Sequence, residues 1–162
     1  MKEYQIIDNF LEENDFYFIR DHIIYNKSFP WFLNHSATSE NSNDGLCFGH
    51  SFHIESKINS NFWELLIPLF EKIVHKTIIR TKVNLYLKTE KIHQHEFHVD
   101  ERYPHNGFLY YLNTNNGYTI LNDGTKIESI SNRALFFDSS LEHASTTCSD
   151  QDFRANININ YF

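Results

Sequence analysis

Cysteine, glycine and proline are scarce in this sequence of 162 residues, which contains two, five and three of them. Two cysteines, Cys47 and Cys148, cannot build the disulfide framework of a small secreted domain, and no CxxC pair is present to bind zinc. The few glycines and prolines form no flexible linker, and the sequence contains no internal repeat. We therefore expect residues 1–162 to form a single domain.

Positively charged blocks and long apolar runs are missing as well. There are 14 lysines and arginines against 21 aspartates and glutamates, and the formal net charge of -7 argues against a nucleic-acid partner. No apolar run approaches the roughly 18 residues that a membrane span needs. The first residues do not follow the pattern of a signal peptide. We expect a soluble, cytoplasmic protein that does not bind membranes.

The whole sequence has 41% hydrophobic and 16% aromatic residues, enough to fill a core. The first half of the chain predicts helices that pack on this core. A short strand from Tyr4 to Ile7 precedes Leu11 to Asn26, where apolar residues recur at helical spacing. The polar residues 35–45 predict a mobile loop. A second helix is expected from about Ser60, and Pro68 is expected to bend it or to limit its first half.

The second half of the chain predicts a sheet. From about Ile78, short segments rich in β-branched and aromatic residues alternate with turn signals, and Asp123-Gly124 between two of them is typical of a β-hairpin. These segments are residues 77–89, 107–113, 117–121, 125–130, 133–139 and 153–162. The order predicts a mainly β sandwich or barrel, with N-terminal helices from about 1–77 packed on one sheet and the main strands from about 78–162.

The residues with the clearest chemistry are His98 and Asp100. In an extended chain, side chains two positions apart point to the same face, so these two can present a nitrogen and an oxygen to one metal ion. His143 is the only histidine after His105 and is the candidate for a third ligand. Two histidines and one carboxylate form a facial triad that leaves metal positions open. His93 and His95 offer a second, cupin-like set, although no glutamate follows at the usual cupin offset.

The last segment alternates strictly between polar and apolar residues. One face carries Arg154 followed by three asparagines at every second position, and the other face is apolar. A solvated edge strand would show the same pattern. If the polar face instead points into a barrel, Arg154 provides a fixed fork for a carboxylate.

Taken in order, His98-Val99-Asp100, His143 and Arg154 resemble the Fe(II)/2-oxoglutarate-dependent dioxygenases, and specifically their prolyl-4-hydroxylase-like branch. Two further short motifs support the resemblance. They are Tyr110-Tyr111-Leu112-Asn113 after the first ligand pair and Arg133-Ala134-Leu135-Phe136-Phe137 before the distal histidine. The resemblance covers roughly residues 83–162 and is looser in the N-terminal half.

This resemblance implies a double-stranded β-helix (jelly-roll) core that uses Fe(II), 2-oxoglutarate and O2, with ascorbate as a further candidate. It implies that His98, Asp100 and His143 bind iron and that Arg154 pairs with the distal carboxylate of 2-oxoglutarate. Three further residues are implied at the cosubstrate. They are Tyr111, Tyr86 and Asn156, the last at a position where many members have serine.

The substrate stays open at this stage, since a jelly-roll scaffold serves many substrates. A peptidyl prolyl or other residue, a free amino acid and another small molecule all fit, and the oligomeric state is not encoded in any pattern. Nucleic-acid demethylases usually show a second arginine on the last strand, where this chain has asparagine and isoleucine. The alternatives are a cupin-type metal enzyme that needs no 2-oxo acid and a non-catalytic jelly-roll protein. His95 is a candidate for the substrate entrance.

Overall fold

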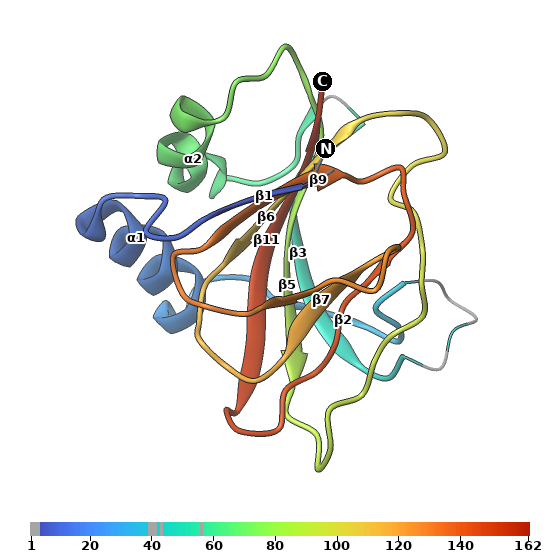
Figure 1. The fold of residues 1–162 in the computed structure, drawn as a ribbon. Coiled ribbons are helices and arrows are strands. Elements are labelled where there is room, and N and C mark those ends of the chain that lie inside the picture. The colour runs from blue at the N-terminus through green and yellow to red at the C-terminus, as the bar shows by residue number, and fades with distance from the viewer. Residues whose placement is uncertain (1–3, 39–41, 43, 56) are drawn as a thin grey trace.

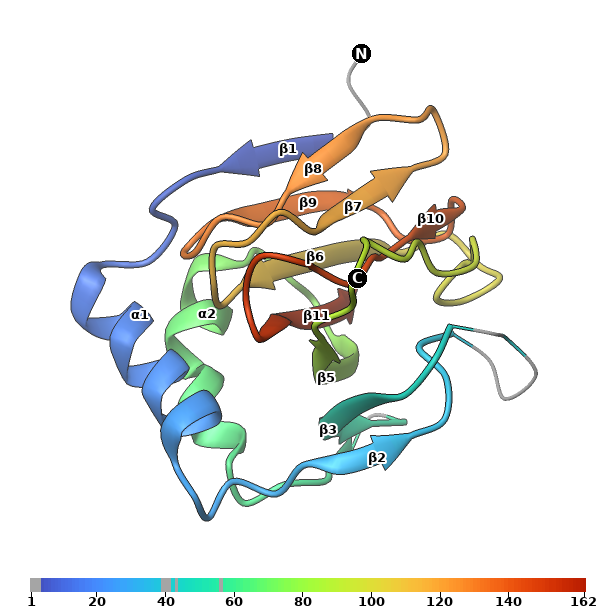
Figure 2. The ribbon, with the colours of Figure 1, turned by 90° about the horizontal axis from the view of Figure 1, so that it is seen from below.

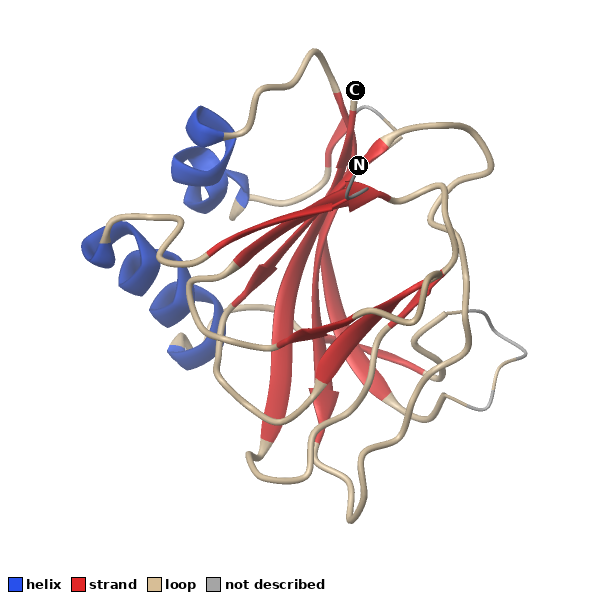
Figure 3. Cartoon of the chain, in the orientation of Figure 1, coloured by secondary structure: helices blue, strands red, loops and turns tan. Residues whose placement is uncertain are grey.

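The computed structural model describes residues 4–38, 42, 44–55 and 57–162. In this part, the chain is mainly β, with one large antiparallel sheet, one small sheet and two short α-helices (Figures 1 and 3). The helices lie against one face of the large sheet, and the small sheet lies on its other side (Figure 1). Polar side chains fill the space between the two sheets, and the candidate site lies among them.

The elements follow one another in chain order from β1 to β11. They are β1 (Tyr4–Ile7), α1 (Glu13–Arg20), the π-helical turn η1 (Asp21–Tyr25), β2 (Phe32–Asn34), β3 (Cys47–Ile54), β4 (Lys57–Ile58), the 3-10 turn η2 (Trp63–Leu66), α2 (Ile67–Lys72), β5 (Ile78–Leu87), β6 (Asn106–Tyr111), β7 (Tyr118–Leu121), β8 (Lys126–Glu128), β9 (Ala134–Asp138), β10 (His143–Ala144) and β11 (Phe153–Tyr161).

The large sheet has the strand order β1-β9-β6-β11-β5-β3-β2, with β4 beside β3, and the small sheet has the order β10-β7-β8. The strand β11 is therefore central and not an edge strand, because it pairs with both β5 and β6. Its apolar residues Ile157 and Ile159 are fully buried in the core beneath the helices. The polar residues of β11 alternate with them, so they occupy the opposite face, towards the small sheet.

The helical layer covers the sheet with apolar side chains. Ile19 and Ile23 of the first helical segment and Leu66 and Leu69 of the second are completely buried in the same core cluster. The first segment is not one regular helix from Leu11 to Asn26, because α1 begins at Glu13 and continues as the π-helical turn η1. In the second, Pro68 stands in the first turn of α2, where its missing N–H costs nothing.

The expected strand segments all appear, and so does the predicted hairpin. The strands β7 and β8 pair across a turn in which Gly124 has a positive φ of 83° and Asp123 accepts a hydrogen bond from the amide of Thr125. The N-terminal half contains more β structure than its pattern predicted. Figure 2 shows β2 and β3 at one end of the large sheet, where β3 pairs with β5 over most of its length.

The strand β3 was missed because its sequence CFGHSFHI mixes histidine, serine and glycine with aromatic residues, and a register shift between Ser51 and His53 breaks the two-residue period. Among the described residues, no helix is both long and apolar enough to cross a membrane.

Candidate metal centre

The structure brings together the three residues that the sequence proposed as metal ligands. His98 and His143 face each other across an isolated β-bridge, in which each residue donates its backbone N–H to the carbonyl of the other at 3.0 and 2.9 Å. Gln94 and Thr146 form a second bridge, so the segment before Asp100 runs antiparallel to the chain around β10. This pairing holds the two imidazoles with 4.6 Å between their ring centroids.

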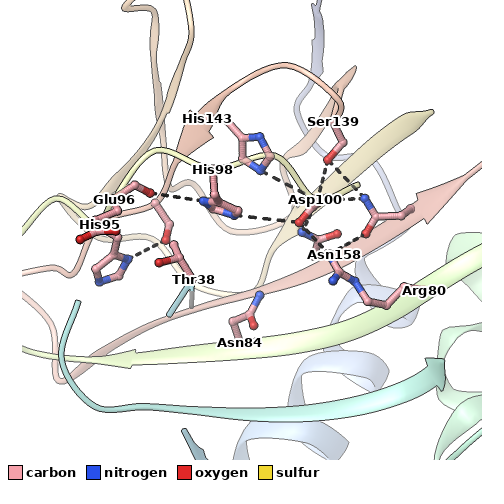
Figure 4. Close-up of polar contacts among 12 residues, drawn as sticks. Thr38, Arg80, Asn84, His95, Glu96, His98, Asp100, Ser139, His143 and Asn158 are labelled. Atoms are coloured by element: carbon pink, nitrogen blue, oxygen red, sulfur yellow. Dashed lines mark hydrogen bonds and ion pairs between the residues drawn. The ribbon is translucent and has the colours of Figure 1, made fainter. Parts of the chain in front are cut away.

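The ligand atoms have the spacing of a metal site. The Nε2 atom of His98 lies 3.9 Å from Oδ1 of Asp100, and the Nε2 atom of His143 lies 3.9 Å from Oδ2. One candidate ligand atom from each residue lies within 4.8 Å of the others (Figure 4). Two atoms bound to the same divalent ion at about 2.0–2.2 Å each can be at most ~4.4 Å apart. Both Asp100 distances fall within this limit.

Both imidazoles are oriented by the backbone. The Nδ1 atom of His98 lies 3.3 Å from the carbonyl oxygen of Glu96, and the Nδ1 atom of His143 lies 3.0 Å from that of Leu141. When Nδ1 carries the proton and donates it to a carbonyl, the ring is neutral and Nε2 has a free electron pair. This tautomer is the one that a metal on the Asp100 side requires.

The carboxylate of Asp100 is held from several directions (Figure 4). Its Oδ1 atom forms an ion pair with Arg80 at 2.6 Å. Its Oδ2 atom accepts hydrogen bonds from Ser139 at 2.5 Å, Asn160 at 2.9 Å and Asn158 at 3.2 Å. Three donors occupy Oδ2, whereas Oδ1 has one partner and retains a lone pair. Oδ1 is therefore the oxygen with the capacity to bind a metal.

The electrostatics of the site keep Asp100 negative and His98 neutral. Burial alone would raise the pKa of Asp100, but the charge of Arg80 and the neighbouring donors hold this pKa well below its ordinary value. Burial, with His143 beside it, lowers the pKa of His98 to about 4. A metal ligand must be a neutral imidazole, and the ring of His98 therefore stays available to a metal in mild acid.

A second feature is the buried guanidinium of Arg154. It donates from Nε to the hydroxyl of Ser129 at 2.7 Å and from Nη2 to Thr119 at 3.0 Å, and Nη1 lies 3.3 Å from the carbonyl oxygen of Thr146. All three acceptors are neutral, and no carboxylate of the described residues forms an ion pair with Arg154. A fully buried cation without a counter-charge is costly unless a ligand supplies that charge.

The other predicted cosubstrate residues lie around this arginine. Its guanidinium lies 5.6 and 5.7 Å from the ring centroids of Tyr86 and Tyr111. The hydroxyl of Tyr111 donates to Thr119, and burial raises the pKa of Tyr86 to about 12, so both phenols remain proton donors. Asn156 accepts from Asn84 at 3.3 Å, which leaves its amide N–H groups to donate elsewhere.

One pocket connects the two features. Its walls include His98 and His143 together with Tyr86, Asn156 and Thr119, and Thr119 accepts a hydrogen bond from Arg154. Along β11, Asn158 lies four positions after Arg154, which corresponds to about 13 Å. An arginine side chain and a five-carbon dicarboxylate can span this distance together.

The cupin-like alternative does not form a cluster. Among the described residues, the one group that could hold a metal is His98, Asp100 and His143. His95 is buried instead, with its Nδ1 atom 2.7 Å from Ser145 and its ring against Tyr86. It supports the wall of the pocket, and His93 beside it is exposed.

The described part of the polar loop is attached to the segment that carries His98 and Asp100. Asp44 accepts the backbone N–H of Glu96 at 2.7 Å, and its other oxygen accepts from Ser42 at 2.7 Å and from Ser36 at 3.3 Å. Thr38 also donates to this oxygen. These residues form a loop, as predicted, and its described part is held by the hydrogen bonds to Asp44; residues 39–41 and 43 lie outside the described residues.

The sequence pattern did not reveal the residues that hold Asp100. Arg80 was missed although β5 shows the relevant signal, which is a polar or tyrosine side chain at every second position from Arg80 to Tyr86. The register of β5 against β11 pairs Arg80 with Asn160 and Asn84 with Asn156, so both polar faces line the same interior. That register depends on non-local pairing, which a single sequence does not show.

Comparison with solved structures places the fold among the 2-oxoglutarate- and Fe(II)-dependent oxygenases. An oxidoreductase of the 2OG-Fe(II) oxygenase family from Burkholderia pseudomallei matches with a TM-score of 0.75 at 10% identity, over 98% of this chain and 84% of that one. A prolyl hydroxylase from Trichoplax adhaerens, in complex with a peptide fragment of the hypoxia-inducible factor oxygen degradation domain, matches with a TM-score of 0.73 at 17% identity, over 100% and 84%.

The viral collagen prolyl hydroxylase of Paramecium bursaria Chlorella virus-1, in complex with 2OG, matches with a TM-score of 0.66 at 16% identity, over 99% of this chain and 97% of that one. No protein-family model matches the sequence, and no curated protein matches it either. The resemblance to the prolyl-hydroxylase-like oxygenases is thereby confirmed at the level of the fold. With identities this low, the reaction of this chain has to be argued from its own residues.

Proposed function

We propose that residues 1–162 form one jelly-roll domain that acts as an Fe(II)- and 2-oxoglutarate-dependent dioxygenase and hydroxylates an organic substrate. The observation that carries the proposal is Arg154, a buried guanidinium with only neutral partners, one of which, Thr119, lines the same pocket as His98 and His143. A ligand that chelates a metal at one end and presents a carboxylate at the other matches both ends. The 2-oxo dicarboxylate is such a ligand.

The residues present fit Fe(II). His98, Asp100 and His143 provide two neutral nitrogens and one carboxylate oxygen, the set that non-haem Fe(II) oxygenases use with open positions for other ligands. The buried amide oxygen of Asn158 has no hydrogen-bond donor among the described side chains, so it can accept a hydrogen bond from a ligand in this pocket. When bound, Fe(II) supplies the redox chemistry that activates O2.

The overall reaction would convert R–H, O2 and 2-oxoglutarate into R–OH, succinate and CO2. One oxygen atom of O2 enters the alcohol and the other enters the new carboxylate of succinate, so the two-electron oxidation of the substrate and the oxidative decarboxylation together consume O2 completely. The cosubstrate is thus used up in each turnover, and succinate release is a direct measure of the reaction.

The protein contributes orientation and exclusion of water. Arg154 and Tyr111 would bind the distal carboxylate, and Tyr86 and Asn156 would donate hydrogen bonds along the cosubstrate. Ser139, together with the asparagines of β11, keeps the carboxylate of Asp100 in one orientation. The buried pocket excludes bulk water, which strengthens each of these interactions.

The test measures succinate formation from 2-oxoglutarate by the Fe(II)-loaded protein across a panel of peptides and amino acids, with product masses inspected for one added oxygen. We expect His98→Ala and Asp100→Ala to abolish turnover while the circular dichroism spectrum stays native. His22→Ala is the matched control, because His22 is exposed on the helical side of the molecule. Normal succinate formation by a folded His98→Ala protein would refute the metal triad.

Two further measurements separate the alternatives. Binding of 2-oxoglutarate to the anaerobic Fe(II) protein should produce a weak visible charge-transfer band, which a cupin-type enzyme without a 2-oxo acid would not show. Arg154→Ala should raise the 2-oxoglutarate concentration needed for half-maximal formation of this band by about 100-fold, as expected for a charge-assisted pair worth ~2–3 kcal/mol. Arg20→Ala, at an exposed surface ion pair, is the control. A protein that binds no iron at all would be the non-catalytic alternative.

A further inference from the structure

Lys82 is a charged side chain of the interior that neither the metal nor the proposed cosubstrate explains. It lies on β5, two residues from Asn84, on the face that points into the barrel. Figure 4 shows Asn84 pointing from this strand towards the metal ligands. Lys82 lines the same pocket as His98 and His143.

The ammonium group forms no ion pair with a described residue, although Asp100 lies near enough to act on its charge. Within the described part of the chain, Lys82 makes no hydrogen bond and no ion pair, because the nearby Asp100 is already engaged by Arg80 and three other donors. Burial, and secondly the charge of Arg80, lower the pKa of Lys82. A partly desolvated cation next to a second cation gains most from an anionic ligand.

Lys82 also lines a second and larger cavity. This cavity, of about 640 Å³, lies over β2 and β3, and it shares Ala37, Lys82 and Asn84 with the metal pocket. Its described walls are aromatic residues such as Phe32 and Phe62 together with amides and hydroxyls, and none of them is acidic. In a protein with a net charge of -7, Lys82 is the one lysine or arginine among these wall residues. A volume of this size suits a small molecule or a single side chain of a peptide.

We propose that the large cavity is the substrate site and that Lys82 binds a carboxylate of the substrate, so that the protein hydroxylates an acidic amino acid or an acidic side chain. The inference rests on the proposed oxygenase function, which it makes more specific. Since Lys82 lines both cavities, the oxidised C–H bond would lie only a few bonds from the carboxylate. The overall balance is unchanged: O2 and 2-oxoglutarate convert the C–H bond into C–OH with release of succinate and CO2.

The assignment gives Arg154 and Lys82 different roles, while the third cation of the interior, Arg80, is paired with Asp100. Arg154 is fully buried against Ser129 and Thr119, where the cosubstrate would bind. Lys82 lies at the junction with the large cavity, from which a substrate enters. Two carboxylate ligands can therefore bind at once without competing for one positive charge.

The experiment compares probes that differ only in charge. L-aspartate is compared with L-asparagine, L-glutamate with L-glutamine, and an alanine hexapeptide containing one aspartate with its asparagine counterpart. Binding is measured by calorimetry on the protein with saturating 2-oxoglutarate and Mn(II), and again without metal, and turnover is measured as succinate and hydroxylated product. The free amino acids and the peptides distinguish the two sources of the carboxylate.

We expect at least one carboxylate probe to bind about tenfold or more tightly than its amide partner. This ratio should fall to near one in Lys82→Met, which keeps the length of the side chain, and should persist in Lys82→Arg. Lys88→Met, at an exposed lysine just beyond the end of β5, is the matched control and should keep the wild-type ratio. A native thermal transition of Lys82→Met establishes that the variant is folded.

The outcomes separate this inference from the proposed function. Equal binding of carboxylates and amides, or a carboxylate preference that survives in Lys82→Met, overturns the role of Lys82. If the main effect of Lys82→Met is to raise the 2-oxoglutarate concentration that the protein needs, the role is overturned as well, because Lys82 would then belong to the cosubstrate site. If carboxylate binding depends on Lys82 but no succinate is ever formed, the substrate site stands and the oxygenase proposal fails.

Discussion

Ser139 binds Asp100 with both its side chain and its main chain. The hydroxyl of Ser139 donates to Oδ2 of Asp100 at 2.5 Å, and the carbonyl of Ser139 accepts the backbone N–H of Asp100 at 3.1 Å. The two residues are 39 positions apart in the sequence. Ser139 follows directly after β9, and it therefore connects the large sheet to the loop segment that carries the carboxylate ligand.

Ser139→Ala should weaken metal binding. The change removes one of three donors to Oδ2 and lets the carboxylate rotate away from the histidines, and lost outer-shell hydrogen bonds of this kind typically cost about 10–100-fold in metal affinity. The measurement is the Mn(II) dissociation constant by calorimetry. Ser140→Ala is the control, because the hydroxyl of Ser140 binds Asp138 and does not touch the site. Equal affinities in the two variants would mean that Asn158 and Asn160 suffice to hold Asp100.

Two glycines should be irreplaceable because each lies against a different part of the candidate site. A substitution at one of them is therefore a control for a substitution at the other. A Cβ atom at Gly107 would lie 2.6 Å from Cβ of Ser139, whereas a Cβ atom at Gly117 would lie 2.6 Å from Cδ of Arg154 and 2.6 Å from the carbonyl oxygen of Thr147. We expect Gly107→Ala to weaken Mn(II) binding, and Gly117→Ala to weaken 2-oxoglutarate binding by about tenfold or more.

The readouts for this pair are the Mn(II) dissociation constant and the 2-oxoglutarate dependence of the anaerobic Fe(II) absorption band. The pattern matters more than the size of either effect. If both glycine variants lose metal and cosubstrate binding to the same extent, the losses reflect general destabilisation, and the two ends of the pocket are not separate units.

The sequence alone was enough to propose the residues of the candidate site, but not the residues that hold them in place. His98, Asp100, His143 and Arg154 could be proposed because each belongs to a short local pattern, and the alternation in β11 showed which of its residues share a face. Whether that polar face meets solvent or the interior is decided by strand neighbours. The central place of β11 between β5 and β6 is a non-local fact.

The same reason explains the missed residues. Arg80 stands in a strand that the sequence predicted correctly, yet its partners Asp100 and Asn160 are 20 and 80 positions away. Asp44 was placed in a polar loop because nothing nearby in the sequence indicates its bond to the amide of Glu96. Composition and periodicity report local structure, and these contacts depend on how distant segments are brought together.

Asp44 should hold its loop against the segment that carries His98 and Asp100. Asp44→Ala removes the acceptor for the amide of Glu96 and for the hydroxyls of Ser36 and Ser42. We expect hydrogen exchange at the amide of Glu96 to accelerate by about tenfold or more, because its hydrogen bond is lost, while Mn(II) affinity changes far less. Asp123→Ala, which removes a similar hydrogen bond to Thr125 in an exposed turn, is the control. Unchanged protection of Glu96 would show that the loop is held by other contacts.

The stability of the metal-free protein should fall as the pH is lowered from about 6.5 to about 4. Burial is the main cause that lowers the pKa of both His95 and His98 from 6.5 to about 4, so in this range the unfolded chain binds protons that the folded chain does not. The pKa of Asp100 is also lowered, but its contribution is lost only below about pH 4, where the unfolded carboxylate protonates.

Because lowering a pKa by one pH unit corresponds to ~1.4 kcal/mol, each of the two histidines accounts for at most about 3 kcal/mol of the free energy of unfolding. His95→Gln should therefore remove the contribution of His95 to the dependence between pH 6.5 and 4, since glutamine does not titrate but can still bind Ser145. The measurement is urea unfolding at several pH values, with the free energy at pH 7 as the reference for each protein. A His95→Gln protein with the full wild-type dependence would mean that the ring of His95 is protonated in the folded state, and that its environment between Ser145 and Tyr86 is wetter than the structure shows.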